Sequence, residues 1–229
     1  MQLEGKCVVV TGGFGVLGAA VAKAALEAGA KVAAIDRAET AAAGVLPDAV
    51  HGFGGVDLAD GTAAAQTLDA VAKTLGGLDA LVNVAGTFRW ESVADGSLDT
   101  WDLLYRVNLR TAVAVSRAAL AHLGGGGRIV NIGAAAAAQA GAGMGAYAAS
   151  KSGVARLTEA LAEELKDRDI TVNAVLPSII DTPANRADMP KADFGRWVQP
   201  AQLAAVIVFL LSDAAAAITG ASIPVRGRV

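Results

Sequence analysis

The segment TGGFGVLG, from Thr11 to Gly18, decides the fold of this chain. It lies between a β-branched run at 6–11 and an alanine-rich segment at 15–27 whose apolar residues have helical spacing. Its glycines fit the pattern G-x-G-x-x-G from Gly13 onward, in which missing side chains let a pyrophosphate approach the backbone at a helix N-terminus. Glycines can also serve a tight turn alone, but the position between a strand and a helix favours dinucleotide binding.

Outward from this segment, short β-branched runs alternate with longer alanine-rich segments of helical periodicity. Such alternation predicts a parallel sheet with helices on both faces. We therefore expect an α/β fold with a single doubly wound Rossmann-type domain over residues 1–229 and about seven parallel strands. Right-handed crossovers then bring the loops after the strands to one crevice, where ligands bind. The expected strands are 6–11, 31–36, 50–56, 80–84, 128–132, 170–176 and 222–225, and the expected helices are 15–27, 62–75, 98–122, 147–166 and 202–212.

Composition excludes several classes of function. The 229 residues are 54% apolar and 18% charged, which is typical of a globular chain with a sizeable core. A net charge of −3 without a lysine- or arginine-rich stretch argues against nucleic acid as a partner. One cysteine and two isolated histidines cannot form an internal disulfide or a zinc site, so we expect a reducing compartment and no metal.

Nothing in the sequence predicts a membrane segment. The first six residues run directly into the first expected strand and leave no room for a signal peptide. The uncharged stretch 129–150 is mostly alanine and glycine and contains Asn131 and Gln139, while the apolar run 203–211 is too short to cross a bilayer. We expect a cytoplasmic protein with a small-molecule substrate.

Asp36 stands at the end of the second expected strand, about twenty residues after the glycine segment. A carboxylate at this place accepts hydrogen bonds from the adenine ribose hydroxyls of a dinucleotide and repels a 2′-phosphate. NAD is therefore the preferred cofactor. Arg37 could pair with a phosphate, which keeps NADP possible, and a solvated turn carboxylate is the plain alternative for Asp36.

Tyr147 and Lys151 form a second constellation, four residues apart at the start of an expected helix. Positions i and i+4 share one helix face, so the ammonium is expected to lower the pKa of the phenol. The helix follows the fifth expected strand, at the edge of the sheet where a ligand would bind. The pair predicts a tyrosine that transfers protons.

Together with further motifs in order along the chain, these residues resemble the short-chain dehydrogenase/reductase family. The additional motifs are Asp57, NVAG at 83–86, Asn108 in VNL, YAASK at 147–151 and PSIIDTP at 177–183. The resemblance covers essentially the whole chain. It implies an NAD(P)(H)-dependent oxidoreductase that transfers a hydride between the nicotinamide and a small carbonyl, imine or quinonoid substrate.

The resemblance also implies roles for individual residues. Tyr147 would be the general acid/base, Lys151 would lower its pKa and bind the nicotinamide ribose, and Asn108 would order a relay water. A homodimer or homotetramer built on helices 98–122 and 147–166 is implied as well. The cofactor-binding residues would be Gly12, Gly13, Phe14, Gly15, Val16, Leu17, Gly18, Asp36, Arg37, Asp57, Leu58, Asn83, Ala85, Gly86, Tyr147, Lys151, Pro177, Ile179 and Thr182, and the substrate pocket would include Ala134, Met144 and Tyr147.

Three departures from the family pattern bear on the substrate. Val16 replaces the second motif glycine, Ser178 replaces a glycine, and Ala134 stands where a hydroxyl residue usually polarises the substrate oxygen. These departures, and above all the string DTPANRADMPKADFGRW at 181–197, resemble the dihydropteridine reductase branch, whose quinonoid substrate needs less polarisation.

Two alternatives remain open. Asn108 and NVAG fit an ordinary ketone or 3-oxoacyl reductase, or an alcohol dehydrogenase, of the same family. A non-catalytic NAD(P)-binding regulatory protein would explain Ala134, but it would have no need for Tyr147, Lys151 and Asn108.

Overall fold

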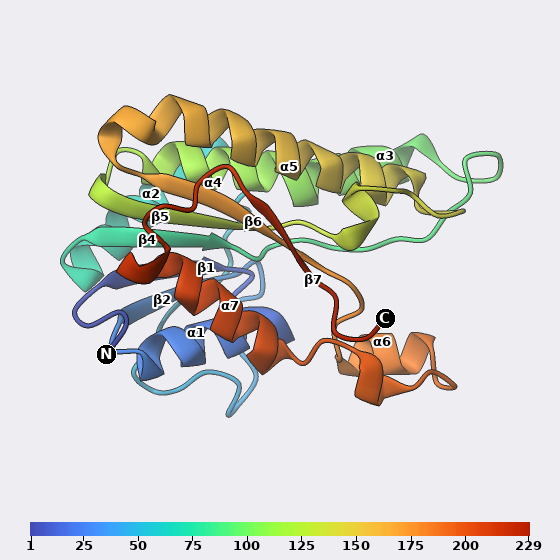
Figure 1. Ribbon diagram of the computed structural model, residues 1–229, viewed down its shortest axis with the longest axis horizontal. Helices are drawn as coiled ribbons and strands as arrows, with labels where there is room; N and C mark the ends of the chain where they lie inside the picture. Colours follow the sequence, from blue (N-terminus) through green and yellow to red (C-terminus); the bar gives the residue numbers. More distant parts are fainter.

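One sheet of seven parallel strands runs through the computed structural model, which describes residues 1–229 (Figure 1). The strand order is β3-β2-β1-β4-β5-β6-β7, so the chain reverses its direction across the sheet between β1 and β4. Ligands bind outside the carboxyl ends of the strands at such a reversal. The predicted doubly wound α/β sheet is confirmed. The strands are β1 (Cys7–Thr11), β2 (Lys31–Ile35), β3 (His51–Phe53), β4 (Leu78–Asn83), β5 (Leu123–Ile132), β6 (Thr171–Pro177) and β7 (Ser222–Val225).

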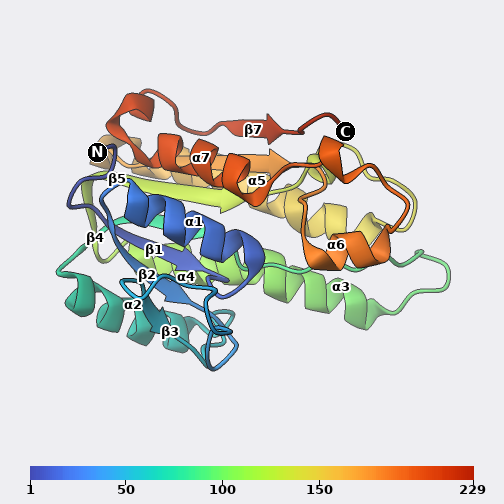
Figure 2. The same ribbon diagram turned by 90° about the horizontal axis from the view of Figure 1, so that it is seen from below.

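Helices cover both faces of this sheet (Figures 1 and 2). Helices α1 (Val16–Glu27) and α7 (Pro200–Leu211) pack on one face, below the sheet in Figure 1. Helices α2 (Gly61–Leu75), α4 (Thr111–Ala119) and α5 (Gly145–Leu165) pack on the other face. The short helices α3 (Leu98–Leu104) and α6 (Pro183–Asp188) lie at the end of the molecule toward which the strands point.

Alternation along each strand divides the core into two layers. In β1, Val8 and Val10 contribute to the core under α1 and α7, while Cys7 and Val9 contribute to the core under α2, α4 and α5. Because successive side chains of a strand point to opposite faces, a strand buried on both sides must be apolar throughout. This explains the continuous run CVVVT, all of whose residues are buried.

The helix predicted over 98–122 is divided into three segments. Between α3 and α4 the chain forms a π-helical turn, η1 (Tyr105–Arg110), and the helix ends at Ala119. The turn contains the buried Asn108, whose side chain bonds to another loop, and the Thr111 hydroxyl donates to the Arg106 carbonyl oxygen. Such wide turns are frequent at functional sites because they reorient a side chain within a helix.

Two other elements differ from the prediction. Strand β5 begins at Leu123 rather than at 128 and includes a glycine run, with a register shift where it pairs with β4. Glycine-rich composition concealed this part of the strand. Helix α6 was not predicted, although Thr182 caps it and Pro183 opens it, which is a recognisable helix-start signal.

No helix combines the length and the apolar character that crossing a membrane requires.

Replacing Leu68 tests the packing of α2 on the sheet. Its side chain is fully buried, so Leu68→Ala is expected to lower the free energy of unfolding by about 2–5 kcal/mol through lost burial and a residual cavity. Gln66→Ala, at an exposed position of the same helix, should change it by less than about 0.5 kcal/mol. Denaturant titration measures both values, and equal losses would contradict this packing.

Candidate active site

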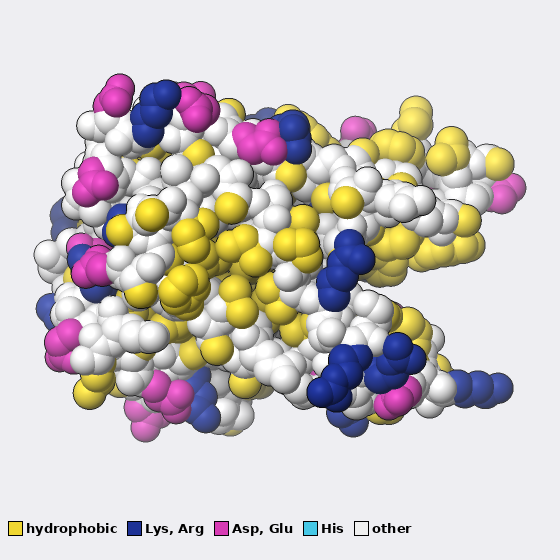
Figure 3. Space-filling view, viewed as in Figure 1, with side chains coloured by type: hydrophobic (Ala, Val, Ile, Leu, Met, Phe, Trp, Pro, Cys, Tyr) yellow, Lys and Arg dark blue, Asp and Glu magenta, His cyan; other side chains and the backbone are white.

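A cavity of about 1390 Å³ opens at the carboxyl ends of the strands. In the space-filling view it appears as the hollow between the part that carries α3 and the part that carries α6 (Figure 3). Its volume exceeds the range of about 300–1000 Å³ for sites that hold one drug-sized ligand. Of the residues predicted for the site, the cavity wall includes Gly12, Gly15, Leu17, Gly18, Asp36, Arg37, Asp57, Leu58, Ala85, Gly86, Ala134, Met144, Tyr147, Lys151, Pro177 and Ile179.

The glycine segment forms a close-packed loop between β1 and α1. Gly12 has a φ of +61°, and a Cβ on Gly18 would lie 2.1 Å from the Gly12 carbonyl oxygen, so side chains are excluded at both positions. No side chain caps the N-terminus of α1, whose first backbone N–H groups stay available to an anion. Val16 begins the helix and is 45% exposed, so its side chain does not fill the loop.

Asp36 and Asp57 lie at one end of the cavity, beside Arg37. The Asp36 carboxylate accepts hydrogen bonds from the backbone N–H groups of Phe14 (3.0 Å) and Ala38 (3.1 Å), which fix its orientation. Asp57 pairs with Arg106, a residue of η1 that sequence analysis missed. The Arg106 hydrogen bond, with another from the Ala59 N–H, lowers the pKa of Asp57.

Tyr147 and Lys151 lie on the first turns of α5, both on the cavity wall. The Lys151 ammonium is buried and donates to the Ile132 carbonyl oxygen at 2.8 Å. Burial lowers the pKa of Lys151 to about 8 and raises the pKa of Tyr147 to about 12. Desolvation is the cause of the raised tyrosine pKa, whereas the sequence predicts a lowering by the Lys151 ammonium, whose hydrogen bond goes to Ile132.

Asn108 joins the loop after β4 to α5. Its Oδ1 accepts from the Thr87 N–H at 2.7 Å, and its Nδ2 donates to the Thr87 carbonyl and to the Ser150 Oγ, each at 3.0 Å. Its amide therefore lies behind the cavity wall. A Cβ on Gly86 would lie 3.0 Å from Asn108 Oδ1 and 3.2 Å from Lys151 Nζ, so glycine leaves room for both groups.

No neighbouring serine takes the place of the hydroxyl missing at Ala134. Ala134 is buried on the cavity wall. The Ser150 hydroxyl donates to the Tyr147 carbonyl, the Ser152 hydroxyl to the Ala137 carbonyl and the Ser178 hydroxyl to the Arg226 carbonyl. All three hydroxyl protons are used within the protein.

Six predicted residues lie outside the cavity wall: Gly13, Phe14, Val16, Asn83, Asn108 and Thr182. The Asn83 amide donates to Ser116 and Asn131 between the strands and α4, so its side chain is directed away from the cavity, contrary to the prediction. The Thr182 hydroxyl accepts from the Asn185 N–H and caps α6. The structure adds Phe88, Arg89, Trp90, Arg106, Asn185, Asp188 and Met189 to the wall.

The site contains no metal constellation, since no three His, Cys, Asp or Glu side chains anywhere in the chain are placed to hold an ion.

Comparison with known proteins finds relatives along nearly the whole chain. A family model described as enoyl-(acyl carrier protein) reductase matches residues 15–227. D-threitol dehydrogenase from Mycolicibacterium smegmatis is 37% identical, covering 99% of this chain and 93% of its own length. A 3-oxoacyl-(acyl-carrier-protein) reductase from Pseudomonas aeruginosa is 36% identical, covering 99% and 98%.

Solved structures agree with these sequence relatives. A short chain dehydrogenase from Burkholderia cenocepacia in complex with NADP has a TM-score of 0.90 and 38% identity, covering 99% of this chain and 98% of its own. A blue fluorescent protein from a metagenomic library, in complex with NADPH, has a TM-score of 0.90 and 31% identity, covering 100% and 99%.

The low pKa of Lys151 makes its effect on stability dependent on pH. Its pKa is about 8 in the folded protein against an ordinary 10.5, so between these values the unfolded chain binds more protons and stability rises with pH. Below pH 8 the full cost of burying the ammonium remains. From pH 8 to pH 10, the free energy of unfolding of the wild type should therefore gain about 2 kcal/mol relative to that of Lys151→Met.

Chemical denaturation of the cofactor-free protein at several pH values measures this difference. Lys23→Met removes an exposed lysine of α1 and should show no such trend. A difference between wild type and Lys151→Met that does not change with pH would contradict the lowered pKa.

Proposed function

The chain belongs to the short-chain dehydrogenase/reductase family, and we propose from its site that it is an NAD(P)(H)-dependent oxidoreductase with Tyr147 as general acid/base. One observation carries the proposal: the Tyr147 and Lys151 side chains line the same cavity as the glycine loop. A dinucleotide held at the loop could extend to the tyrosine within this cavity. The substrate is a small carbonyl, imine or quinonoid compound.

The cavity wall fits a dinucleotide at several places. The backbone between Gly12 and Gly18, in which a Cβ at either end would collide, would hold the pyrophosphate at the N-terminus of α1. Asp36 would accept hydrogen bonds from the adenine ribose, and Lys151 would donate to the nicotinamide ribose. Ile179 would contact the carboxamide. When bound, the nicotinamide supplies or accepts a hydride.

Tyr147 moves the proton that accompanies hydride transfer. Reduction of a carbonyl or imine leaves negative charge on the acceptor atom, which a group within hydrogen-bond reach must protonate. The Tyr147 phenol lines the same cavity wall as Ala134 and Lys151, and we assign this proton to its hydroxyl. A proton on Lys151 would favour the phenolate that remains after transfer.

The surroundings of Tyr147 favour an acceptor that needs little polarisation. Ala134 offers no hydroxyl to a substrate oxygen, and Phe88, Trp90 and Met144 make this part of the wall apolar. These features, with the resemblance of 181–197 to dihydropteridine reductase, support a flat quinonoid or imine substrate. An ordinary ketone or 3-oxoacyl reductase, or an alcohol dehydrogenase, is the second candidate, supported by the names of the relatives described above.

Two further expectations concern a role without catalysis and the oligomeric state. A regulatory protein without catalysis would not require Tyr147 and Lys151 on one cavity wall. Assembly into a homodimer or homotetramer remains a prediction. Exposed apolar side chains in the segment 98–122 are Trp101 on α3, Tyr105 in η1 and Val113 on α4.

Cofactor preference follows from Asp36. A 2′-phosphate near this carboxylate meets a repulsion of about 1–4 kcal/mol, so kcat/KM should be about tenfold or more higher with NADH than with NADPH. Asp36→Ala should narrow this ratio, whereas Arg37→Ala should widen it. Steady-state kinetics with both cofactors measures the ratio. Equal or better use of NADPH by the wild type would show that Arg37, not Asp36, controls this end of the cavity.

Tyr147→Phe tests the proposed mechanism directly. It removes the proton and keeps the ring, so kcat should fall by about 10² to 10⁴ while cofactor affinity changes little. NADH oxidation with ketones, quinones and quinonoid pterins as acceptors measures kcat, and fluorescence titration measures NADH binding. Full activity of Tyr147→Phe would refute the mechanism for every substrate.

Ala134→Ser separates the two substrate classes in the same assay. For a simple ketone, the restored hydroxyl should raise kcat/KM by up to about tenfold, the value of one hydrogen bond. For a quinonoid imine, the added oxygen should be neutral or harmful.

A further inference from the structure

The aromatic ring of Phe88 packs edge-on against the ring of Tyr147. The ring centroids are 4.9 Å apart and the ring planes meet at 84°, which is the geometry that aromatic pairs favour. No protein group forms a hydrogen bond with the Tyr147 hydroxyl, and Ala134 cannot supply one. Ring packing, rather than a hydrogen bond to the hydroxyl, therefore restrains the phenol.

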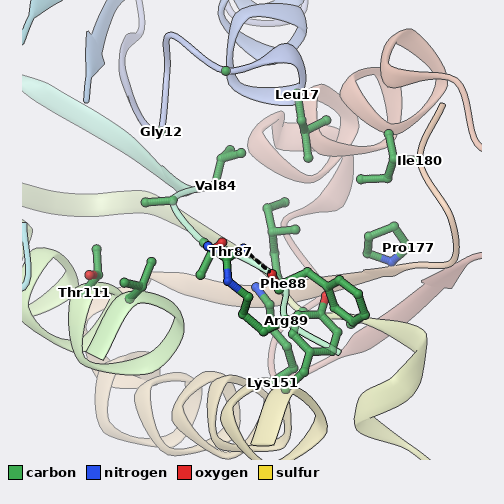
Figure 4. Close-up of a pocket in the computed structure, with 18 of the residues that line it drawn as sticks. Gly12, Leu17, Val84, Thr87, Phe88, Arg89, Thr111, Lys151, Pro177 and Ile180 are labelled. Atoms are coloured by element: carbon green, nitrogen blue, oxygen red, sulfur yellow. Dashed lines mark hydrogen bonds between the residues drawn. The ribbon is translucent and has the colours of Figure 1, made fainter. Parts of the chain in front are cut away.

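The backbone on both sides of Phe88 is fixed. Before it, Thr87 makes two hydrogen bonds to the Asn108 amide. After it, the Trp90 indole N–H donates to the Ala142 carbonyl at 2.9 Å and the Glu91 N–H donates to the Gly143 carbonyl at 2.8 Å. Figure 4 shows Thr87, Phe88 and Arg89 leading into the cavity near Lys151. The hydrogen bonds on both sides therefore restrict the backbone that carries the Phe88 ring.

The Asn108 amide also bonds to α5, the helix that carries Tyr147. Asn108 Nδ2 donates to the Ser150 Oγ at 3.0 Å, and the Ser150 hydroxyl donates to the Tyr147 carbonyl at 2.8 Å. Contacts thus run from the Phe88 ring to the Tyr147 ring, along α5 to Ser150, and through Asn108 back to Thr87. These contacts together fix the distance between the loop after β4 and helix α5, and therefore the contact between the Phe88 and Tyr147 rings.

We propose that Phe88 is a positioning residue that orients the Tyr147 phenol by edge-to-face contact, on a cavity wall where Ala134 supplies no hydroxyl. The inference rests on the proposed role of Tyr147. The ring contact would hold the phenol in one orientation without a hydrogen bond to its hydroxyl. Phe88 is 44% exposed, so the part of its ring turned away from Tyr147 stays open to the cavity.

Fluorine NMR tests the contact without any substrate. The chain has two tyrosines, so the protein made with 3-fluorotyrosine has two tyrosine positions, which Tyr105→Phe assigns. In Phe88→Leu, the Tyr147 signal should shift and should no longer show the separate lines of a ring held in one orientation. Phe88→Trp keeps an aromatic ring at this position without adding a tyrosine, and it should preserve those lines. Phe209→Leu makes the same chemical change on α7, outside the cavity, and should leave the signal unchanged. An unchanged Tyr147 signal in Phe88→Leu would overturn the proposal.

Kinetics distinguishes positioning from substrate binding. The assay uses NADH and the best acceptor among ethyl acetoacetate, 9,10-phenanthrenequinone and a quinonoid dihydropterin. Phe88→Leu should lower kcat about five- to tenfold, leave NADH affinity unchanged and lower Tm by no more than a few degrees. Ala134→Ser should raise kcat about threefold or more further in the Phe88→Leu background than in the wild type, because the added hydroxyl then supplies the restraint that the ring no longer gives.

The outcomes separate this inference from the proposed function. A raised KM with unchanged kcat in Phe88→Leu, or strictly multiplicative effects in the double variant, would overturn the positioning role. If Tyr147→Phe loses activity while Phe88→Leu keeps its full kcat, only the positioning role of Phe88 is refuted. Full activity of both variants would refute the role of Tyr147 itself.

Discussion

The buried side-chain amide of Asn108 is the constraint on which the arrangement of the site depends. It bonds the loop after β4 at Thr87 and the helix α5 at Ser150, and it reaches both because the chain widens into a π-helical turn at 105–110. Without the amide, the Thr87 N–H and carbonyl would lose their partners, and each buried unpaired group costs about 1–3 kcal/mol. The separation between the two segments is therefore well determined.

A second constraint operates where the β1 and β4 loops meet. A Cβ on Gly12 would lie 2.9 Å from the Ala85 backbone, and one on Gly18 would lie 2.1 Å from the Gly12 carbonyl oxygen. Glycine at these positions lets two loops and the start of α1 approach one another, so that the α1 N-terminus opens into the same cavity as Tyr147. The uncapped N-terminus of α1 and the Tyr147 phenol thereby line one cavity, which is the arrangement that the proposed hydride transfer with a dinucleotide requires.

Much of this could be predicted because it depends on local sequence pattern. Runs such as CVVVT between alanine-rich amphipathic segments have the two periodicities of a buried parallel sheet and its helices, and the i, i+4 spacing alone places Tyr147 and Lys151 on one face. Features set by contacts across the chain were not accessible. The π-helical turn depends on what Asn108 bonds, and the pairing of Arg106 with Asp57 joins residues 49 positions apart.

Two further differences between the sequence prediction and the structure concern the pKa of Tyr147 and the role of Phe88. The i, i+4 spacing places Tyr147 and Lys151 on one face of α5, and both line the cavity. Spacing gives no measure of desolvation, which raises the pKa of the tyrosine. Phe88 was overlooked because an aromatic residue after NVAG has no local signature; its contact with Tyr147 spans 59 positions.

The structure of the complex with NADH tests the central claim most directly. The account predicts the pyrophosphate at the α1 N-terminus and the nicotinamide ring beside Tyr147, with a ribose hydroxyl within hydrogen-bond distance of Lys151 Nζ. A nicotinamide located away from Tyr147, or an NADH molecule bound outside this cavity, would contradict it.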